Sequence, residues 1–152
     1  HITRLRSITL AALLLAPLAS LHASEVANLR CEYRENPLGI RPDPAAPGFK
    51  KIIIKPAIVG DLTWVKAHYD SPYGRIVSNW KREGDKLTME VTIPANTTVH
   101  VPAKAEAGVT ESGTPTMKAK SVKFLRMESN AAVYAVGSGT YRFQSPLPET
   151  IK

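Results

Sequence analysis

Cysteine and long apolar runs are the scarce features of this sequence. Its 152 residues include one cysteine, Cys31, which excludes an intrachain disulfide and a zinc site built on several cysteines. The apolar stretch Ile8–Leu18 is interrupted twice and is well short of the ~20 residues that a membrane-spanning helix needs. The formal charge is +7, but no run of five basic residues occurs, so we interpret the charge as solvated surface and expect no nucleic-acid partner.

Motifs of several catalytic classes are also missing. The sequence contains no glycine-rich phosphate loop, no serine–histidine–aspartate arrangement and no redox pair of cysteines. His68 and His100 fall on separate predicted strands without a third ligand at a useful spacing, so we expect no metal and no cofactor. Several carboxylates fall on predicted turns or polar strand faces, where a solvated or turn-capping role is the expectation. They are Asp61, Asp70, Glu83, Asp85 and Glu90.

Residues 1–23 have the pattern of a secretory signal peptide. Arg4 and Arg6 precede the apolar stretch, and small residues leading to Ala23 offer a cleavage point. We therefore expect an exported chain, periplasmic or extracellular, with no membrane partner after signal cleavage.

Residues 24–46 are interpreted as an N-terminal remnant followed by a proline-rich linker. Leu29, Cys31 and Tyr33 alternate with charged residues, which predicts at most a short edge strand. Three prolines between residues 41 and 47 exclude a helix or a central strand there. This segment is therefore expected to be a linker or an irregular cover.

Residues 47–145 predict an all-β domain, followed by a tail at 146–152. The β-branched run Ile52–Ile54 favours a strand, and its unbroken apolar character predicts burial on both faces. Apolar and polar residues alternate from Leu87 to Ile93, the clearest period of two in the chain. Without helical apolar spacing over three turns, the fold class is an antiparallel β-sandwich of roughly eight strands. The predicted strands are 52–54, 62–69, 75–81, 87–93, 97–101, 121–128, 131–136 and 140–143, with a polar loop and room for one small strand at 103–117.

Four segments then carry a resemblance to a known family. They are PGFKKIIIKP at 47–56, YDSPYGRIVSNW at 69–80, VTIPANTT at 91–98 and VGSGTY at 136–141. In this order and spacing they closely resemble the C-terminal β-sandwich domain of bacterial α-L-rhamnosidases, glycoside hydrolase family 78, over roughly residues 41–143. Residues 29–40 are similar to the opening of the mature chain of the same enzymes.

The resemblance implies a truncated enzyme. In the family, several hundred residues that include an (α/α)6 barrel separate these two regions, and both catalytic carboxylates come from the barrel. A deletion near residues 39–41, or a gene model that omits the barrel, would account for its absence here. The resemblance therefore implies no catalytic residue, a missing barrel as the natural partner, and a non-catalytic accessory or structural role. Loss of that partner would expose apolar surface and favour self-association.

Two other functions stay open. A free-standing carbohydrate-binding module would use a surface row of aromatic rings with polar neighbours. Residual glycoside hydrolase activity would need two carboxyl groups about 6.5–9.5 Å apart in a cleft, as in inverting glycosidases. Whether the chain is an enzyme is therefore uncertain from the sequence, although the resemblance weighs against it.

The candidate contacts for a rhamnose-containing saccharide are Lys51, Trp64, Tyr73 and Trp80. In many family members a histidine at the position of Lys51 reaches from the sandwich edge towards the sugar, so the resemblance implies a weakened role here; a solvated lysine is the alternative. The three aromatic rings can stack on a sugar face, although Trp and Tyr on strands are more often core or interface residues. An exposed Trp64 or Trp80 would favour the binding module.

Overall fold

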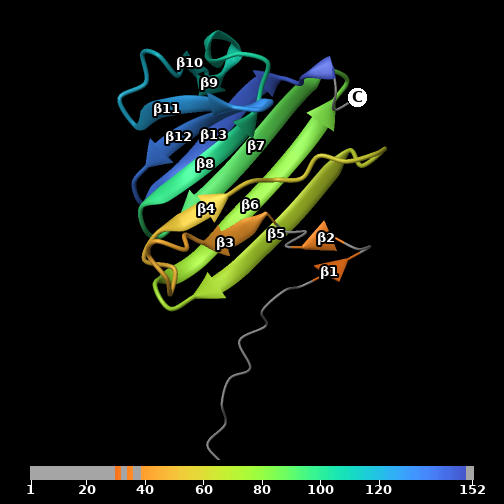
Figure 1. The fold of residues 1–152 in the computed structure, drawn as a ribbon. Coiled ribbons are helices and arrows are strands. Elements are labelled where there is room, and N and C mark those ends of the chain that lie inside the picture. The colour runs from red at the N-terminus through yellow and green to blue at the C-terminus, as the bar shows by residue number, and fades with distance from the viewer. Residues whose placement is uncertain (1–29, 32–33, 36–38, 150–152) are drawn as a thin grey trace, which may run out of the picture.

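The computed structural model describes residues 30–31, 34–35 and 39–149. The predicted signal peptide lies outside them. Two β-sheets pack face to face (Figure 1). The larger sheet contains β5 (Trp64–Ser71), β6 (Gly74–Glu83), β7 (Lys86–Ile93), β9 (Thr110–Glu111), β10 (Thr114–Pro115) and β13 (Gly139–Pro146). The smaller contains β3 (Ile40–Pro42), β4 (Ile52–Ile54), β8 (Thr97–Pro102), β11 (Val122–Glu128) and β12 (Ala131–Val136).

The β-sandwich and its predicted strands are confirmed. The larger sheet has the order β10-β9-β13-β7-β6-β5 and the smaller has the order β11-β12-β8-β4-β3. Neighbouring strands pair antiparallel except β4 and β8, which run parallel. This parallel pair is an exception to the antiparallel sandwich that the sequence predicts. Parallel neighbours need a long crossover, and the β5–β6–β7 meander in the opposite sheet provides it.

The core lies between the sheets and follows the strand periodicity. Along β7, Leu87 and Met89 are buried, whereas Thr88 is half-buried and Glu90 is exposed. In β4 the expectation of burial on both faces is wrong for the middle residue, because Ile53 is only half-buried between the fully buried flanking isoleucines. Ile53 points away from the opposite sheet, so only its neighbours reach the core.

Both ends of the domain extend further than the sequence predicts. Ile40–Pro42 forms edge strand β3 beside β4, rather than an irregular linker, because a proline is tolerated at a sheet edge. At the other end β13 continues to Pro146. The next residue, Leu147, is buried in the core and donates its backbone N–H to the Asp85 carbonyl at 2.7 Å, so the predicted tail begins inside the fold.

The remaining short elements lie near the predicted loop and linker. The 103–117 loop contains the 3-10 helix η1 (Glu106–Gly108) and the short strands β9 and β10. Upstream, β1 (Arg30–Cys31) pairs with β2 (Arg34–Glu35) in a two-stranded sheet of their own. The edge strand expected around residues 29–33 is therefore seen in part, and it pairs outside the two main sheets. Within the described residues, no helix has the length and apolar character needed to cross a bilayer.

Charged side chains cover the outer face of the smaller sheet. Lys55 and Arg126 both donate to the Glu128 carboxylate, at 3.3 and 2.7 Å. His100 on β8 is 5% exposed, and its Nδ1 has no hydrogen-bond partner within the described part of the chain. Burial lowers the pKa of His100, while the nearby Glu128 opposes that shift. Burial therefore favours the neutral form of the imidazole.

Candidate functional site

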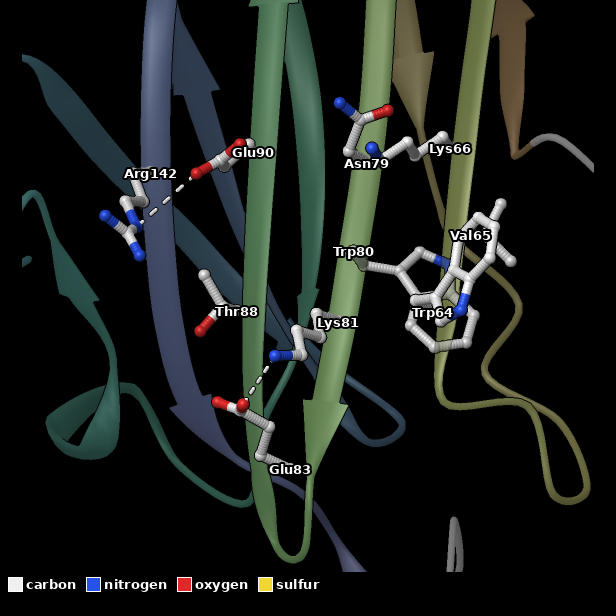
Figure 2. A pocket seen from close by; sticks show the side chains of 10 residues that line it. All are labelled: Trp64, Val65, Lys66, Asn79, Trp80, Lys81, Glu83, Thr88, Glu90 and Arg142. Carbon is white, nitrogen blue, oxygen red and sulfur yellow. Dashed lines mark hydrogen bonds and ion pairs between the residues drawn. The ribbon is translucent and has the colours of Figure 1, made fainter.

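A shallow hollow of about 330 Å³ crosses the outer face of the larger sheet (Figure 2). Strand register builds it from two rows of side chains. In the first row Trp64 pairs with Lys81, which pairs with Thr88. In the second row Lys66, Asn79, Glu90 and Arg142 pair in turn across β5, β6, β7 and β13. We call this surface the Trp64 trough; Glu83 lies at its end beside Lys81.

The two tryptophans of the chain occupy opposite faces of the sheet. Trp64 is 60% exposed, whereas Trp80 is 4% exposed and belongs to the core. Trp80 pairs with Val65, the residue after Trp64, and successive residues of a strand face opposite sides. Trp64 therefore presents its indole to the trough, and the candidate Trp80 is a core residue.

Four of the five charged side chains in the trough form two ion pairs. Lys81 Nζ donates to Glu83 Oε1 at 2.6 Å, and Arg142 Nε lies 3.6 Å from Glu90 Oε1. The hydrogen bond from Lys81 lowers the pKa of the Glu83 carboxyl group. A general acid of a glycosidase needs a raised pKa, so Glu83 is poorly suited to that role.

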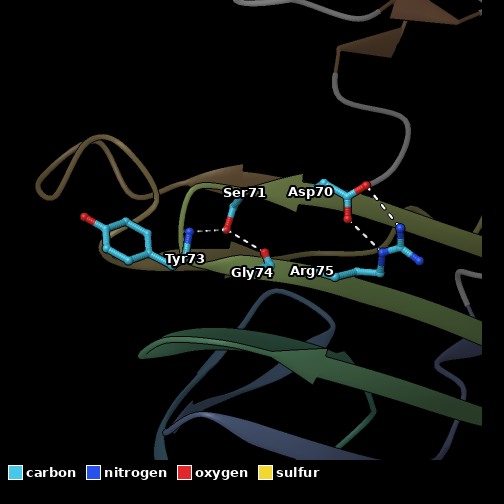
Figure 3. A network of polar contacts seen from close by, with 5 residues as sticks. All are labelled: Asp70, Ser71, Tyr73, Gly74 and Arg75. Carbon is cyan, nitrogen blue, oxygen red and sulfur yellow. Dashed lines mark hydrogen bonds and ion pairs between the residues drawn. The ribbon is translucent and has the colours of Figure 1, made fainter.

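Tyr73 lies at the β5–β6 hairpin and is 49% exposed (Figure 3). Its backbone N–H donates to Ser71 Oγ at 3.2 Å, and that hydroxyl donates to the Gly74 carbonyl at 2.7 Å. Beside the turn, Arg75 donates to both carboxylate oxygens of Asp70, at 2.7 and 3.2 Å, and this lowers the pKa of Asp70. The ring of Tyr73 is accessible, but it does not line the trough.

Lys51 lies apart from Trp64, just before β4 on the smaller sheet. Its Nζ is 3.0 Å from Asp43 Oδ2. The Ala45 backbone N–H, and then Lys51, lower the pKa of Asp43. Lys51 also lines a second hollow together with Asn96 and Leu125. Among the four predicted contacts, therefore, Trp64 and Trp80 line the trough, and of these two Trp64 is the exposed one.

The other carboxylates do not form an acid–base pair in a cleft. Within the described chain, every displaced carboxyl pKa is lowered, and the groups concerned are Asp43, Asp70, Glu83 and Glu128. The buried Glu111 accepts hydrogen bonds from the hydroxyls of Ser112 and Ser121, at 2.5 and 3.0 Å. In residues 39–149 and the two short strands before them, no group of three or more His, Cys, Asp or Glu side chains could hold a metal ion.

The sequence did not single out the polar residues that accompany Trp64. Lys66, Asn79, Lys81, Thr88 and Arg142 come from four strands, and only the register places them together. One local signal was available. Trp64 is two residues from Lys66 and so shares the outer face of its strand with a charged residue. Trp80 is four residues from Ile76 and so shares the inner face with an apolar residue. Alternation alone therefore separates an outward tryptophan from a core tryptophan.

Comparison with known proteins gives a consistent family. The family described as bacterial alpha-L-rhamnosidase C-terminal domain matches residues 39–115, just over half of the chain. An alpha-L-rhamnosidase of Formosa agariphila is 29% identical over 104 residues, which are 67% of this chain and 11% of that protein.

Two solved structures are also similar. The Streptomyces avermitilis alpha-L-rhamnosidase complexed with L-rhamnose has a TM-score of 0.61 and 27% identity, over 72% of this chain and 10% of that chain. The alpha-L-rhamnosidase from Dictyoglumus thermophilum has a TM-score of 0.60 and 32% identity, over 71% of this chain and 12% of that chain. The chain thus spans about a tenth of the length of the curated relatives that it matches.

Proposed function

Because this chain belongs to the bacterial alpha-L-rhamnosidase C-terminal domain family, we propose that it is a non-catalytic accessory β-sandwich. In a whole α-L-rhamnosidase, which removes terminal α-L-rhamnose from glycosides, such a domain packs against a catalytic (α/α)6 barrel and supports it. We propose a barrel of this kind as the partner of this domain.

One observation carries the proposal. The carboxylates with displaced pKa values are exposed or partly exposed and are bonded to cations, backbone N–H groups or both, which favours their ionised form. Glycoside hydrolysis in this class needs one carboxylic acid that stays protonated opposite a carboxylate that activates water. The only buried carboxylate within residues 39–149, Glu111, accepts hydrogen bonds from two serine hydroxyls. The chemistry therefore belongs to the partner domain.

Hydrolysis of a chromogenic α-L-rhamnoside tests the non-catalytic role. The full chain is expected to release no chromophore above the rate in buffer, with a whole α-L-rhamnosidase as the positive control. Turnover that persists after a second, independent purification and disappears in a variant of Glu83 or Glu90 would overturn the proposal.

A chimaera tests the supporting role. Residues 39–149 replace the corresponding domain in the Dictyoglumus thermophilum enzyme, which is 32% identical in this region. We expect the chimaera to unfold at a higher temperature and to retain more hydrolysis than the same enzyme with the domain deleted. A chimaera that is no better than the deletion would contradict a packing role.

We also propose export, on the basis of the signal-peptide pattern of residues 1–23. Expression with a C-terminal tag in a bacterial host should place a shortened chain in the periplasm or the medium. Replacing Leu13 and Leu14 in the apolar stretch with arginine should keep it in the cytoplasm at full length. If the parent chain and the arginine variant were found in the same compartment at the same length, export would be contradicted.

Self-association is a further consequence of an uncovered partner surface. Large apolar side chains are exposed near β5 and on β11, where a bulge at Leu125 interrupts the pairing. They include Leu62, Trp64, Tyr69, Leu125 and Met127. Sedimentation velocity should show a concentration-dependent oligomer that weakens in a Leu125→Lys, Met127→Lys variant. A chain that stays monomeric at all concentrations would contradict self-association.

A further inference from the structure

We propose that the Trp64 trough is a binding site for a short, uncharged oligosaccharide. One pyranose ring stacks on the Trp64 indole, and the following sugar units lie across β6, β7 and β13. This goes beyond the accessory role, because the trough is formed entirely by this chain and does not involve a catalytic partner.

The shape of the trough suits an elongated ligand. Neighbouring strands of a sheet are about 4.8 Å apart, so the three steps from Trp64 on β5 to Arg142 on β13 span about 14 Å. The two rows of side chains are two residues apart along each strand, which makes the trough about 7 Å wide. A ligand a single sugar ring in length would leave the far end with Glu90 and Arg142 unused (Figure 2).

The indole of Trp64 is placed as a stacking platform. It is 60% exposed, and it makes no ring contact with another aromatic residue in the part of the chain that the structure describes. Core packing does not account for it, because Trp80 fills the corresponding place on the inner face. An exposed indole next to polar groups presents an apolar face together with one N–H donor, which matches the C–H face and hydroxyl rim of a sugar.

The polar groups beside the indole are both donors and acceptors. The side chains of Lys66 and Thr88 make no hydrogen bond or ion pair with any residue of the described ranges. Asn79 uses its Oδ1 to accept from the Ala67 N–H at 3.3 Å, which leaves its amide N–H groups for a ligand. The 3.6 Å separation of Arg142 and Glu90 leaves donor and acceptor capacity on both. Sugar hydroxyls donate and accept at once, so they can satisfy this mixed set.

The charge pattern disfavours other classes of ligand. Glu83 and Glu90 engage Lys81 and Arg142 in ion pairs, so few cations of the trough are left to neutralise the phosphates of a phosphate chain or a nucleic acid. Purely apolar ligands would desolvate the five charged groups in the trough, which are Lys66, Lys81, Arg142 and the two glutamates, without replacing their hydrogen bonds. With three positive and two negative charges the site is close to neutral, and an uncharged hydroxyl-rich ligand fits it best.

The test follows binding to the full chain by tryptophan fluorescence and calorimetry. The probes are L-rhamnose, a neutral rhamnose-containing tetrasaccharide, a panel of neutral oligosaccharides, and heparin as a polyanion. We expect saturable quenching with at least one neutral tetrasaccharide, and weaker binding of the monosaccharide. Binding should fall by about tenfold or more in Trp64→Ala and by less in Trp64→Phe, which keeps a ring.

Matched variants separate the trough from the rest of the surface. Lys66→Ala should weaken binding several-fold, whereas Lys123→Ala, an exposed lysine on β11 of the other sheet, should leave it unchanged. Because Trp64 is exposed, its variants should keep the thermal midpoint of the parent chain. The absence of quenching and heat with the whole panel, equal binding by Trp64→Ala, or preference for heparin would each overturn the proposal. Trp64→Ala should leave the stability of the chimaera unchanged, so a failure here is distinct from a failure of the accessory role.

Discussion

The rings of Phe49 and Tyr69 stack with their centroids 4.6 Å apart and their planes inclined by 22°. Phe49 precedes β4 of the smaller sheet, and Tyr69 lies on β5, the edge strand of the larger sheet. The contact therefore joins the two layers at an edge of the sandwich. Phe49 has a φ of 61°, in the left-handed region that costs a side chain about 1–2 kcal/mol, so the stack also offsets a backbone penalty.

Removing this stack should destabilise the domain. We expect Tyr69→Ala to lower the free energy of unfolding by about 1–3 kcal/mol, because it loses both the ring contact and buried apolar area. The control is Tyr73→Ala at the exposed hairpin, which should change the free energy of unfolding by no more than about 0.5 kcal/mol. Urea denaturation of both variants checks this; equal effects would show that the stack contributes nothing specific.

A glycine fixes the start of the sandwich. Gly39 has a φ of +65°, and a Cβ built there would lie 2.4 Å from the Lys55 carbonyl oxygen. The Lys55 backbone N–H also donates to the Gly39 carbonyl at 2.7 Å. Gly39→Ala should therefore cost about 3 kcal/mol or more, since both strain and a backbone clash are introduced.

Gly48→Ala is the matched control for that substitution. Gly48 has a similar φ of +74°, but no atom lies within 4 Å of the added Cβ. We expect about 1 kcal/mol of destabilisation from backbone strain alone. If thermal or urea denaturation gave equal losses for the two variants, the close approach of Gly39 to the backbone of Lys55 and Pro56, which follow β4, would be disproved.

The stability of the domain should depend on pH through His100. Burial lowers its pKa in the folded state below the usual 6.5, so the unfolded chain binds a proton more readily. The neutral imidazole therefore stabilises the fold above pH 6.5, and this contribution falls as the pH drops from 6.5 towards the lower folded-state pKa. The slope cannot exceed about 1.4 kcal/mol per pH unit for one proton. The charged groups near His100 are Glu128, Lys55, Arg126 and Arg41.

Two histidine variants separate this effect from others. His100→Gln should flatten the dependence below pH 6.5, whereas His68→Gln, at an exposed position on β5, should preserve it. Loss of stability at still lower pH would instead report protonation of Glu128, whose pKa is lowered from 4.5 chiefly by the hydrogen bond from Arg126. Urea denaturation at a series of pH values checks both; an unchanged profile in His100→Gln would contradict the assignment.

The two tryptophans should be distinguishable in solution. Trp64→Phe leaves only the buried Trp80, so its emission should shift to shorter wavelength and resist quenching by acrylamide. Trp80→Phe leaves the exposed Trp64 and should do the opposite. Acrylamide titration of both variants measures this. Equal accessibility of the two indoles would contradict the register that pairs Trp80 with Val65.

Local periodicity was sufficient for most strands. The stretch from Leu87 to Ile93 alternates because one face of β7 is buried and the other is wet, and such a pattern needs no knowledge of the neighbouring strands. Edge strand β3 was missed because the three prolines between residues 41 and 47 indicate irregular backbone, while the pairing that accommodates Pro42 depends on β4. Leu147 was assigned to a tail because it lies between two prolines, with no apolar pattern nearby in the sequence to indicate that its side chain is buried.

The candidate site was predicted only in part. Trp64 and Trp80 were treated alike, since both are tryptophans on predicted strands. The alternation already placed Trp64 on the same face as Lys66 and Trp80 on the same face as Ile76. Lys51 was chosen by resemblance, and its observed partner is Asp43 in the preceding loop. The association of Lys66, Asn79, Glu90 and Arg142 could not be found from spacing, because these residues are separated by up to 76 positions.

The sequence alone determined a β-sandwich, because β-branched runs, period-two alternation and turn residues act over a few neighbouring positions. Its rhamnosidase C-terminal type followed from the resemblance of four segments to that family. The tertiary structure decided which tryptophan reaches solvent, which charges share a face with it, and that β4 lies parallel to β8. These features depend on register between strands far apart in the chain. A shift of one residue would exchange the two faces, and only packing of the whole core selects the register.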